Sequence, residues 1–314
     1  MSTQGIEQPH VQQPPGRKPR GSRRKPTDAS PLTPYIFMAP YLLLFLIFIV
    51  IPSVFGIWIS LHNWDYLLPG KPWVGLENYT NLFSSNSTTG GPFWNSMEAT
   101  GKFTLYSVPL LVVIPLVVAL ILNQKIRGIQ FFRAMYFAPY VLGVAVIGIL
   151  WRYLLDPNIG LVNYYLGAKL PWITALPWAW VSLVGVTVWW TLGFNSVIYL
   201  AGLQDIDPAL YDAAKVDGAN RWQRFVNVTM PGLRPVLLFV VTVTILASAN
   251  MFGQSYIITQ GAPGEETTTA IMYIAETGLR QFNMGAASAM SYVLALALLL
   301  VSIVNFAVFR NRGD

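Results

Sequence analysis

Polar side chains recur at regular spacing inside two long apolar runs of this sequence. One run carries Thr187, Thr191 and Asn195, with the aromatic Phe194 beside them, and a later run carries Asn250 and Gln254. Residues four apart share one face of a helix, and hydroxyl and amide groups both donate and accept hydrogen bonds. These residues could therefore bind a polar molecule. Alternatively, they could form hydrogen bonds to a neighbouring helix or to the backbone.

A second polar set is the charged stretch YDAAKVDGANRW, which begins at Tyr211 between two apolar runs. Seven charged side chains lie between Asp205 and Arg224. At about 3 kcal/mol each at the centre of a membrane helix, they exclude this stretch from a bilayer interior. A short helix rich in alanine either connects two apolar runs or inserts into the groove of a partner.

Capping residues predict two short helices here. Asp207 is suited to cap the first helix, and Gly218 to end it in the left-handed conformation. Asn220 and Gln223 have the spacing of a capping box for the second helix, which Pro231 is expected to end.

Several kinds of chemistry are excluded. The sequence has no cysteine and two distant histidines, His10 and His62, so we expect no metal site. It has no Gly-x4-Gly-Lys-Ser/Thr phosphate loop. The polar groups inside the apolar runs have no acid, base or nucleophile beside them, so the sequence predicts neither an enzyme nor a resident cofactor.

Composition places the chain in a membrane. Hydrophobic residues make up 54% of its 314 residues and charged residues 11%, less than half the charged share of soluble proteins. Residues 1–34 are rich in Pro, Gln and Arg and predict a disordered basic tail. This tail suits a cytoplasmic anchor better than a nucleic-acid-binding arm.

The elements that must position the polar groups are six transmembrane helices within an all-α polytopic domain at 35–314. Apolar runs of spanning length lie at 35–61, 102–122, 134–155, 177–203, 234–258 and 284–309. With both termini cytoplasmic, fifteen of the 20 Lys and Arg residues lie inside, as the positive-inside rule requires. The charged stretch then belongs to a cytoplasmic loop at 205–232, between spans four and five.

The spacing of this loop resembles that of a known family. Asp212-Ala213-Ala214 is followed after three residues by Gly218, and Pro231 comes after twelve more. This is similar to the EAA loop of ABC importer permeases, in which Glu stands where this chain has Asp212. The segments Ala214–Ala219, Thr259–Gly264 and Gly285–Ala289 are most similar to carbohydrate permeases of the maltose type.

The resemblance implies a permease subunit in the bacterial cytoplasmic membrane. Its implied partners are a second homologous permease, an ABC ATPase dimer that hydrolyses the ATP, an extracytoplasmic substrate-binding protein, the sugar and membrane lipid, with no nucleic acid. The loop would form a coupling helix that docks on the ATPase. The residues implied at that contact are Asp212, Ala213, Ala214, Asp217, Gly218, Arg221, Arg224 and Pro231.

The implied function is import of a sugar or oligosaccharide by alternating access. Maltose-type permeases bind sugar near the polar residues described first. Asn250 matches one of their contact positions, and Thr187, Thr191 and Phe194 align with others but differ in type. The same machinery carrying a phosphorylated polyol such as glycerol 3-phosphate stays open. An ion-coupled secondary transporter is the rival class, although no acidic residue lies in mid-span.

The charge distribution predicts a labelling pattern. In intact cells, single cysteines placed at Gly16 and Ala219 should be shielded from impermeant thiol reagents, and one at Ser85 should react, because only the last lies in a predicted outer loop. The parent chain is its own unlabelled control, since it has no cysteine. Labelling of the Ala219 site from outside would show that the predicted orientation is wrong.

Overall fold

The computed structural model describes residues 33–84, 87–124 and 127–310, and the regular elements among them are helices joined by loops. Within them, β pairing is limited to two isolated bridges, His62–Trp73 and Asp65–Asn283. The longer helices are α1 (Thr33–Phe45), α2 (Ile51–Ser60), α4 (Gly90–Leu122), α5 (Ile129–Val141), α6 (Val144–Leu154), α8 (Trp178–Asp205), α11 (Met230–Ala249) and α13 (Met284–Arg310). The shorter ones are α3 (Glu77–Phe83), α7 (Leu161–Leu166), α9 (Pro208–Val216), α10 (Arg221–Arg224) and α12 (Ala270–Ala275), with π-helical turns η1 (Leu46–Val50), η2 (Phe225–Thr229), η3 (Ser255–Thr259) and η4 (Glu276–Arg280).

Within the described residues, five helical segments are long and apolar enough to cross a membrane, and a bent pair, α5 and α6, gives a sixth where it is counted as one broken span. The prediction of an all-helical membrane protein is therefore confirmed. Most of the predicted tail lies outside the described residues. The chain divides into two compact units, residues 1–53 and 54–314. In the first unit, α1 and η1 expose apolar side chains on every face, as expected for a helix that lies in lipid.

The second span begins earlier than predicted. It was expected at 102, and α4 begins at Gly90. Polar residues in the extra turns do not break the helix because their hydroxyls bond to its own carbonyls: Ser96 Oγ donates to Phe93 O at 2.7 Å, and Thr100 Oγ1 to Ser96 O at 2.9 Å. Lys102 also pairs with Glu98 one turn away, at 2.9 Å. At about 1.5 Å per residue, this helix is longer than a bilayer core is thick.

The third span is not the single helix predicted at 134–155. It consists of α5 and α6, which are bent by 95° relative to each other. Leu142 and Gly143 at the junction are extended, with ψ of 136° and 150°. The run of apolar residues is continuous in sequence, so hydrophobicity alone does not reveal this bend.

The fifth span also differs from the prediction of 234–258. A continuous helical segment runs from Arg221 to Ala249 and then stops. Pro231 was expected to end the second short helix, and this expectation is wrong. Pro231 lies directly after η2, inside this continuous segment, so the helix runs past a residue that has no backbone N–H to donate.

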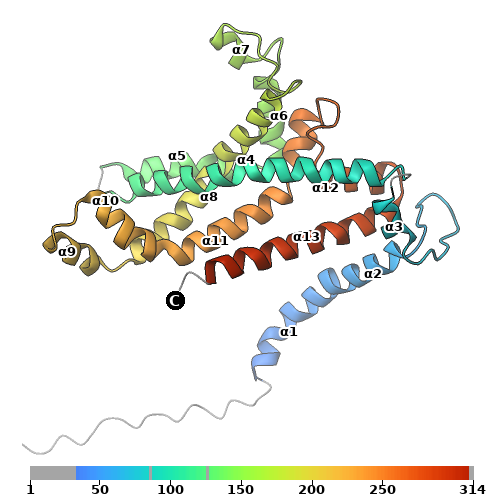
Figure 1. Ribbon diagram of the computed structural model, residues 1–314, viewed down its shortest axis with the longest axis horizontal. Helices are drawn as coiled ribbons and strands as arrows, with labels where there is room; N and C mark the ends of the chain where they lie inside the picture. The colour runs from blue at the N-terminus through green and yellow to red at the C-terminus, as the bar shows by residue number, and fades with distance from the viewer. Residues whose placement is uncertain (1–32, 85–86, 125–126, 311–314) are drawn as a thin grey trace, which may run out of the picture. The chain divides into compact units, whose positions relative to one another are not determined.

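Helix α8 is central to the second unit, since it contacts α4, α5 and α11. Figure 1 shows α4, α11 and α13 running lengthwise beside one another. One core cluster gathers around Phe103, Leu183 and Ile258, and another around Tyr199, Leu233 and Val240. At Gly193 the backbones of α8 and α5 approach so closely that an added Cβ would lie 2.6 Å from Phe137 Cα.

This close approach predicts opposite effects of one substitution at two sites on α8. Gly193→Ala should lower the melting temperature of the purified protein, because overpacking against backbone costs about 1–3 kcal/mol. Gly185→Ala is the matched control, since nothing lies within 4 Å of its added Cβ. It should stabilise the helix by about 0.5–1 kcal/mol. Equal melting temperatures for the two variants would contradict the tight α5–α8 contact.

Candidate functional site

A cavity of about 470 Å³ lies between α5, α8 and α11. The structure brings all six sequence-predicted residues to its wall, although they come from distant parts of the chain. These are Thr187, Thr191, Phe194, Asn195, Asn250 and Gln254. Further polar lining comes from Thr244 and Ser248 on α11. A volume of this size accommodates a small polar ligand.

The three polar residues of α8 already make hydrogen bonds within the protein, two of them inside α8 and one to α4. Thr187 Oγ1 donates to Leu183 O at 2.7 Å, and Thr191 Oγ1 donates to Thr187 O at 2.8 Å. Asn195 is buried, and its Nδ2 donates across to Leu111 O of α4 at 3.0 Å. The threonine hydroxyls therefore offer a ligand mainly their acceptor lone pairs, and Asn195 also has a structural role.

Asn250 and Gln254 do not share a helical face, because α11 ends at Ala249. Asn250 caps that end: its backbone N–H and its Nδ2 both donate to Leu246 O, at 3.1 and 2.8 Å. This satisfies one of the carbonyls that a helix end leaves open. Helix resumes only at Gly253. Both side chains nevertheless reach the cavity, Asn250 from an exposed position and Gln254 from a buried one.

The cavity also has aromatic walls, most of which the sequence reasoning missed. Tyr140 of α5 stacks on Phe194 with ring centroids 4.7 Å apart and an angle of 18°. Trp190 lies beside Tyr140 at 6.4 Å, and its Nε1 donates to Leu142 O at 3.1 Å. Trp190 could have been found from its spacing with Phe194, whereas Tyr140 required the tertiary structure.

None of the described residues that line the cavity is Asp, Glu, Lys, Arg or His. The site therefore has neither a countercharge for an ionic ligand nor an acid–base pair. Taking a carboxylate or phosphate out of water without such a partner is strongly unfavourable. The arrangement suits a neutral ligand that has hydroxyl groups for the amides and apolar faces for the aromatic rings.

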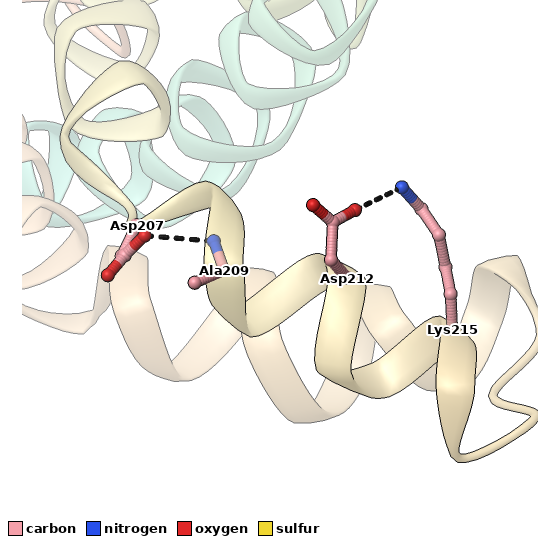
Figure 2. A network of polar contacts seen from close by, with 4 residues as sticks. All are labelled: Asp207, Ala209, Asp212 and Lys215. Carbon is pink, nitrogen blue, oxygen red and sulfur yellow. Dashed lines mark hydrogen bonds and ion pairs between the residues drawn. The ribbon is translucent and has the colours of Figure 1, made fainter.

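The caps and the glycine turn of the charged loop are built as its sequence predicts. Figure 2 shows Asp207 accepting from Ala209 N at 2.8 Å and Asp212 bonded to Lys215 at 2.7 Å. Asn220 and Gln223 form the capping box, with bonds of 2.8 and 2.9 Å. Gly218 has φ of 78°, in the left-handed region. The predicted caps and the left-handed glycine are confirmed.

Most of the loop residues predicted to meet a partner are exposed. Asp212, Ala213, Asp217, Gly218, Arg221 and Pro231 are exposed, and Ala214 and Arg224 are half-buried. The hydrogen bond and charge of Lys215 lower the pKa of Asp212, which keeps that carboxylate ionised at neutral pH. Three apolar side chains that the sequence reasoning did not single out are also exposed: Leu210, Val216 and Trp222.

Tyr211 attaches this loop to the membrane segment. Its Oη lies 3.0 Å from Thr229 Oγ1, and its ring packs against the core cluster around Tyr199. Helix α9 is thus held in place while its outward face stays open.

Residues 102–311 match the family model of the binding-protein-dependent transport system inner membrane component. The chain belongs to this family. The permease is 33% identical to the trehalose/maltose transport system permease protein MalF of Thermococcus litoralis, over 89% of this chain and 94% of that protein. It is 32% identical to the arabinooligosaccharides transport system permease protein AraP of Bacillus subtilis, over 89% and 90% of the two chains.

The permease also shares its fold with a solved structure. A chain of a bacterial ABC transporter involved in the import of alginate superposes with a TM-score of 0.75 at 23% identity, covering 89% of this chain and 96% of that one. The family match and the two relatives confirm the resemblance to ABC importer permeases. The chain is a multi-pass inner-membrane component, and ATP hydrolysis belongs to a separate subunit. The matched range includes both the charged loop and every residue of the cavity wall.

Proposed function

We propose that this permease imports a neutral sugar or oligosaccharide through the cavity between α5, α8 and α11. The uncharged wall of amides, hydroxyls and aromatic rings is the observation that carries the proposal. Two relatives in this family, at 33% and 32% identity, are named for trehalose/maltose and arabinooligosaccharide transport. Sugars present hydroxyl groups and apolar ring faces, and this wall offers partners for both.

The cavity argues against a phosphorylated polyol or an acidic sugar as the substrate. Either would bring a negative charge to a wall whose described residues include no Lys, Arg or His. Family membership removes the ion-coupled secondary transporter from consideration.

The proposed assembly pairs this chain with a second permease, an ABC ATPase dimer and an extracytoplasmic binding protein. In this proposal both termini and the loop at 205–232 lie in the cytoplasm, which the distribution of Lys and Arg favours. The loop docks on the ATPase through the face of α9 that carries Asp212 and Ala213. Its exposed apolar side chains, Leu210 and Val216, are 54% and 88% accessible and supply buried area at the contact.

Gly218 should be essential for coupling because the turn between α9 and α10 needs positive φ. Gly218→Val strains that turn by about 1–3 kcal/mol, so we expect ATPase copurification and sugar uptake to fall sharply while membrane insertion stays normal. Gly128→Val is the matched control: Gly128 has φ of 79° and open space around it, in a different loop. If both variants lose uptake and ATPase copurification to the same extent, the effect comes from general backbone strain and not from the coupling contact.

Reversing the charge at Asp212 tests the same contact independently. Asp212→Lys should also weaken ATPase copurification, and Asp212→Glu, which keeps the charge, should behave like the parent chain. Unchanged uptake in both Gly218→Val and Asp212→Lys would overturn the docking proposal.

Asn250 and Asn195 should separate substrate binding from helix packing. Asn250 is exposed in the cavity, so Asn250→Ala should raise the apparent KM for sugar uptake about tenfold, the loss of roughly 1–2 kcal/mol from one hydrogen bond. Basal ATP hydrolysis and assembly should be normal. Asn195→Ala removes the bond to Leu111 O and should lower the melting temperature. A lowered melting temperature with unchanged KM in Asn250→Ala would make Asn250 a structural residue.

A further inference from the structure

A second cavity, of about 180 Å³, lies between the N-terminal turns of α4 and the segment 264–268, and is called the α4 pocket. Helix α4 lines it with Asn95, Glu98 and Lys102, and the segment contributes Glu265 and Glu266. Sites for drug-sized ligands measure roughly 300–1,000 Å³. The α4 pocket therefore admits a smaller group, such as a single ring or the end of one side chain.

Lys102 connects the two walls of the α4 pocket. Its Nζ lies 2.9 Å from Glu98 Oε1 on the same helix and 3.7 Å from Glu266 Oε2 on the segment. The second contact is longer than a hydrogen bond, and the side chains of Lys102 and Glu266 are 37% and 49% exposed. Among the described residues, Glu265 makes no ion pair. Polar groups on both walls are therefore available to a ligand.

The charges of the α4 pocket favour a neutral ligand. The ammonium of Lys102 already lies beside Glu98 and Glu266, so it repels a second cation, and the carboxylates repel an anion. The described residues contain no group of three or more His, Cys, Asp or Glu side chains that could hold a metal ion. Carboxylates accept hydrogen bonds, an ammonium donates them, and the amide of Asn95 does both. This combination fits hydroxyl groups, and the half-buried ring of Tyr273 on the same wall offers an apolar face.

The hydroxyl of Thr268, on the same wall, has no hydrogen-bond partner in the described part of the chain. Thr268 is only 7% exposed, and burying a hydroxyl without a hydrogen bond is unfavourable. The neighbouring hydroxyls differ, since Thr267 Oγ1 donates to Ala262 O at 2.8 Å and Thr269 Oγ1 donates to Met251 O at 2.7 Å. A ligand in the α4 pocket would supply the partner that Thr268 lacks.

The α4 pocket adjoins the cavity between α5, α8 and α11. Lys102 lines the pocket, whereas the next residue, Phe103, lines the cavity. The chain directly after the segment is attached to α4, because Ala270 N donates to Thr100 Oγ1 at 2.8 Å. A ligand that contacts both walls of the α4 pocket therefore strengthens the attachment of 264–268 to α4, beside the cavity wall.

We propose that the α4 pocket is a second sugar-binding site, which takes one neutral sugar unit on the outer side of the membrane. Glu98 and Glu266 accept hydrogen bonds from its hydroxyl groups, and Lys102 donates to them. Thr268 gains the partner that it lacks, and Tyr273 packs its ring against an apolar face of the sugar. The inference rests on the proposed function, which supplies both the neutral sugar and the topology.

Protection of an introduced thiol tests this site, because the parent chain has no cysteine. Pro92→Cys places a thiol on the wall of the α4 pocket without removing any of its polar groups. In the whole transporter in nanodiscs, without the binding protein, we titrate maltose, trehalose and an arabinooligosaccharide. At about ten times its Kd, a bound sugar should slow the reaction of this thiol with maleimide about tenfold. Thr80→Cys, on an exposed position of α3 outside the pocket, is the matched control and should react at an unchanged rate.

Substitutions on the wall test which residues hold the sugar. Glu266→Ala, combined with Pro92→Cys, should abolish the protection. Glu276→Ala is the matched control, since it removes a carboxylate that pairs with Arg280 and does not line the α4 pocket. Ala247→Cys places a thiol in the wall of the cavity, and sugar protection of that thiol in the Glu266→Ala chain shows that the chain is folded. Protection at Pro92→Cys that survives Glu266→Ala would overturn the inference.

The two thiols also separate the inference from the proposed function. If sugar protects Ala247→Cys but not Pro92→Cys, the second site alone is overturned. If none of the three sugars protects either thiol, the proposed function fails as well. Protection of Pro92→Cys by the binding protein without sugar, and not by sugar, would make the α4 pocket a protein contact and overturn the inference.

Discussion

Polar groups within a hydrocarbon layer must find partners inside the protein, and this requirement governs the structure. Serine and threonine hydroxyls in the spans donate to carbonyls one turn away, as Thr187 and Thr191 do. Longer side chains join different helices: Asn195 reaches Leu111 O, and Asn305 reaches Thr242 Oγ1 at 2.6 Å. The same groups that make a path for a polar molecule therefore also stabilise the helices around it.

The two breaks in the spans follow from this requirement. The backbone leaves the helical conformation at Leu142–Gly143 and again after Ala249, and residues at both breaks line the cavity or adjoin it. Side chains take up the freed carbonyls, since Trp190 Nε1 donates to Leu142 O and Thr269 Oγ1 to Met251 O at 2.7 Å. Irregular backbone at membrane depth is tolerated only where protein or a polar cavity surrounds it.

Local signals in the sequence were sufficient for the approximate positions of the spans, the caps at Asp207 and Asn220, and the left-handed Gly218. Each depends on neighbours within a few residues, so spacing predicts it. The α5–α6 bend, the end of α11 before Asn250 and the helix that continues past Pro231 were not predicted. The two helices at the bend are held by contacts such as Gly193 against Phe137 and Arg152 against Ile257, which bring together residues far apart in the chain. The six cavity residues were found, but the aromatic wall at Tyr140 required the fold.

A single helical segment joins the two sites of the proposed mechanism. It begins at Arg221 in the charged loop and ends at Ala249, beside Asn250 in the cavity. Its 29 residues span about 44 Å at 1.5 Å per residue. Under the proposed function, a displacement of the loop by the ATPase is carried along this helix to the cavity wall. The π turn η2 and Pro231 lie near the loop end, where wider hydrogen bonding and a missing N–H make a helix easiest to bend. At the cavity, this helical segment ends at Ala249, before Asn250. A displacement of the segment therefore moves Asn250 relative to Gln254 rather than deforming one continuous helix.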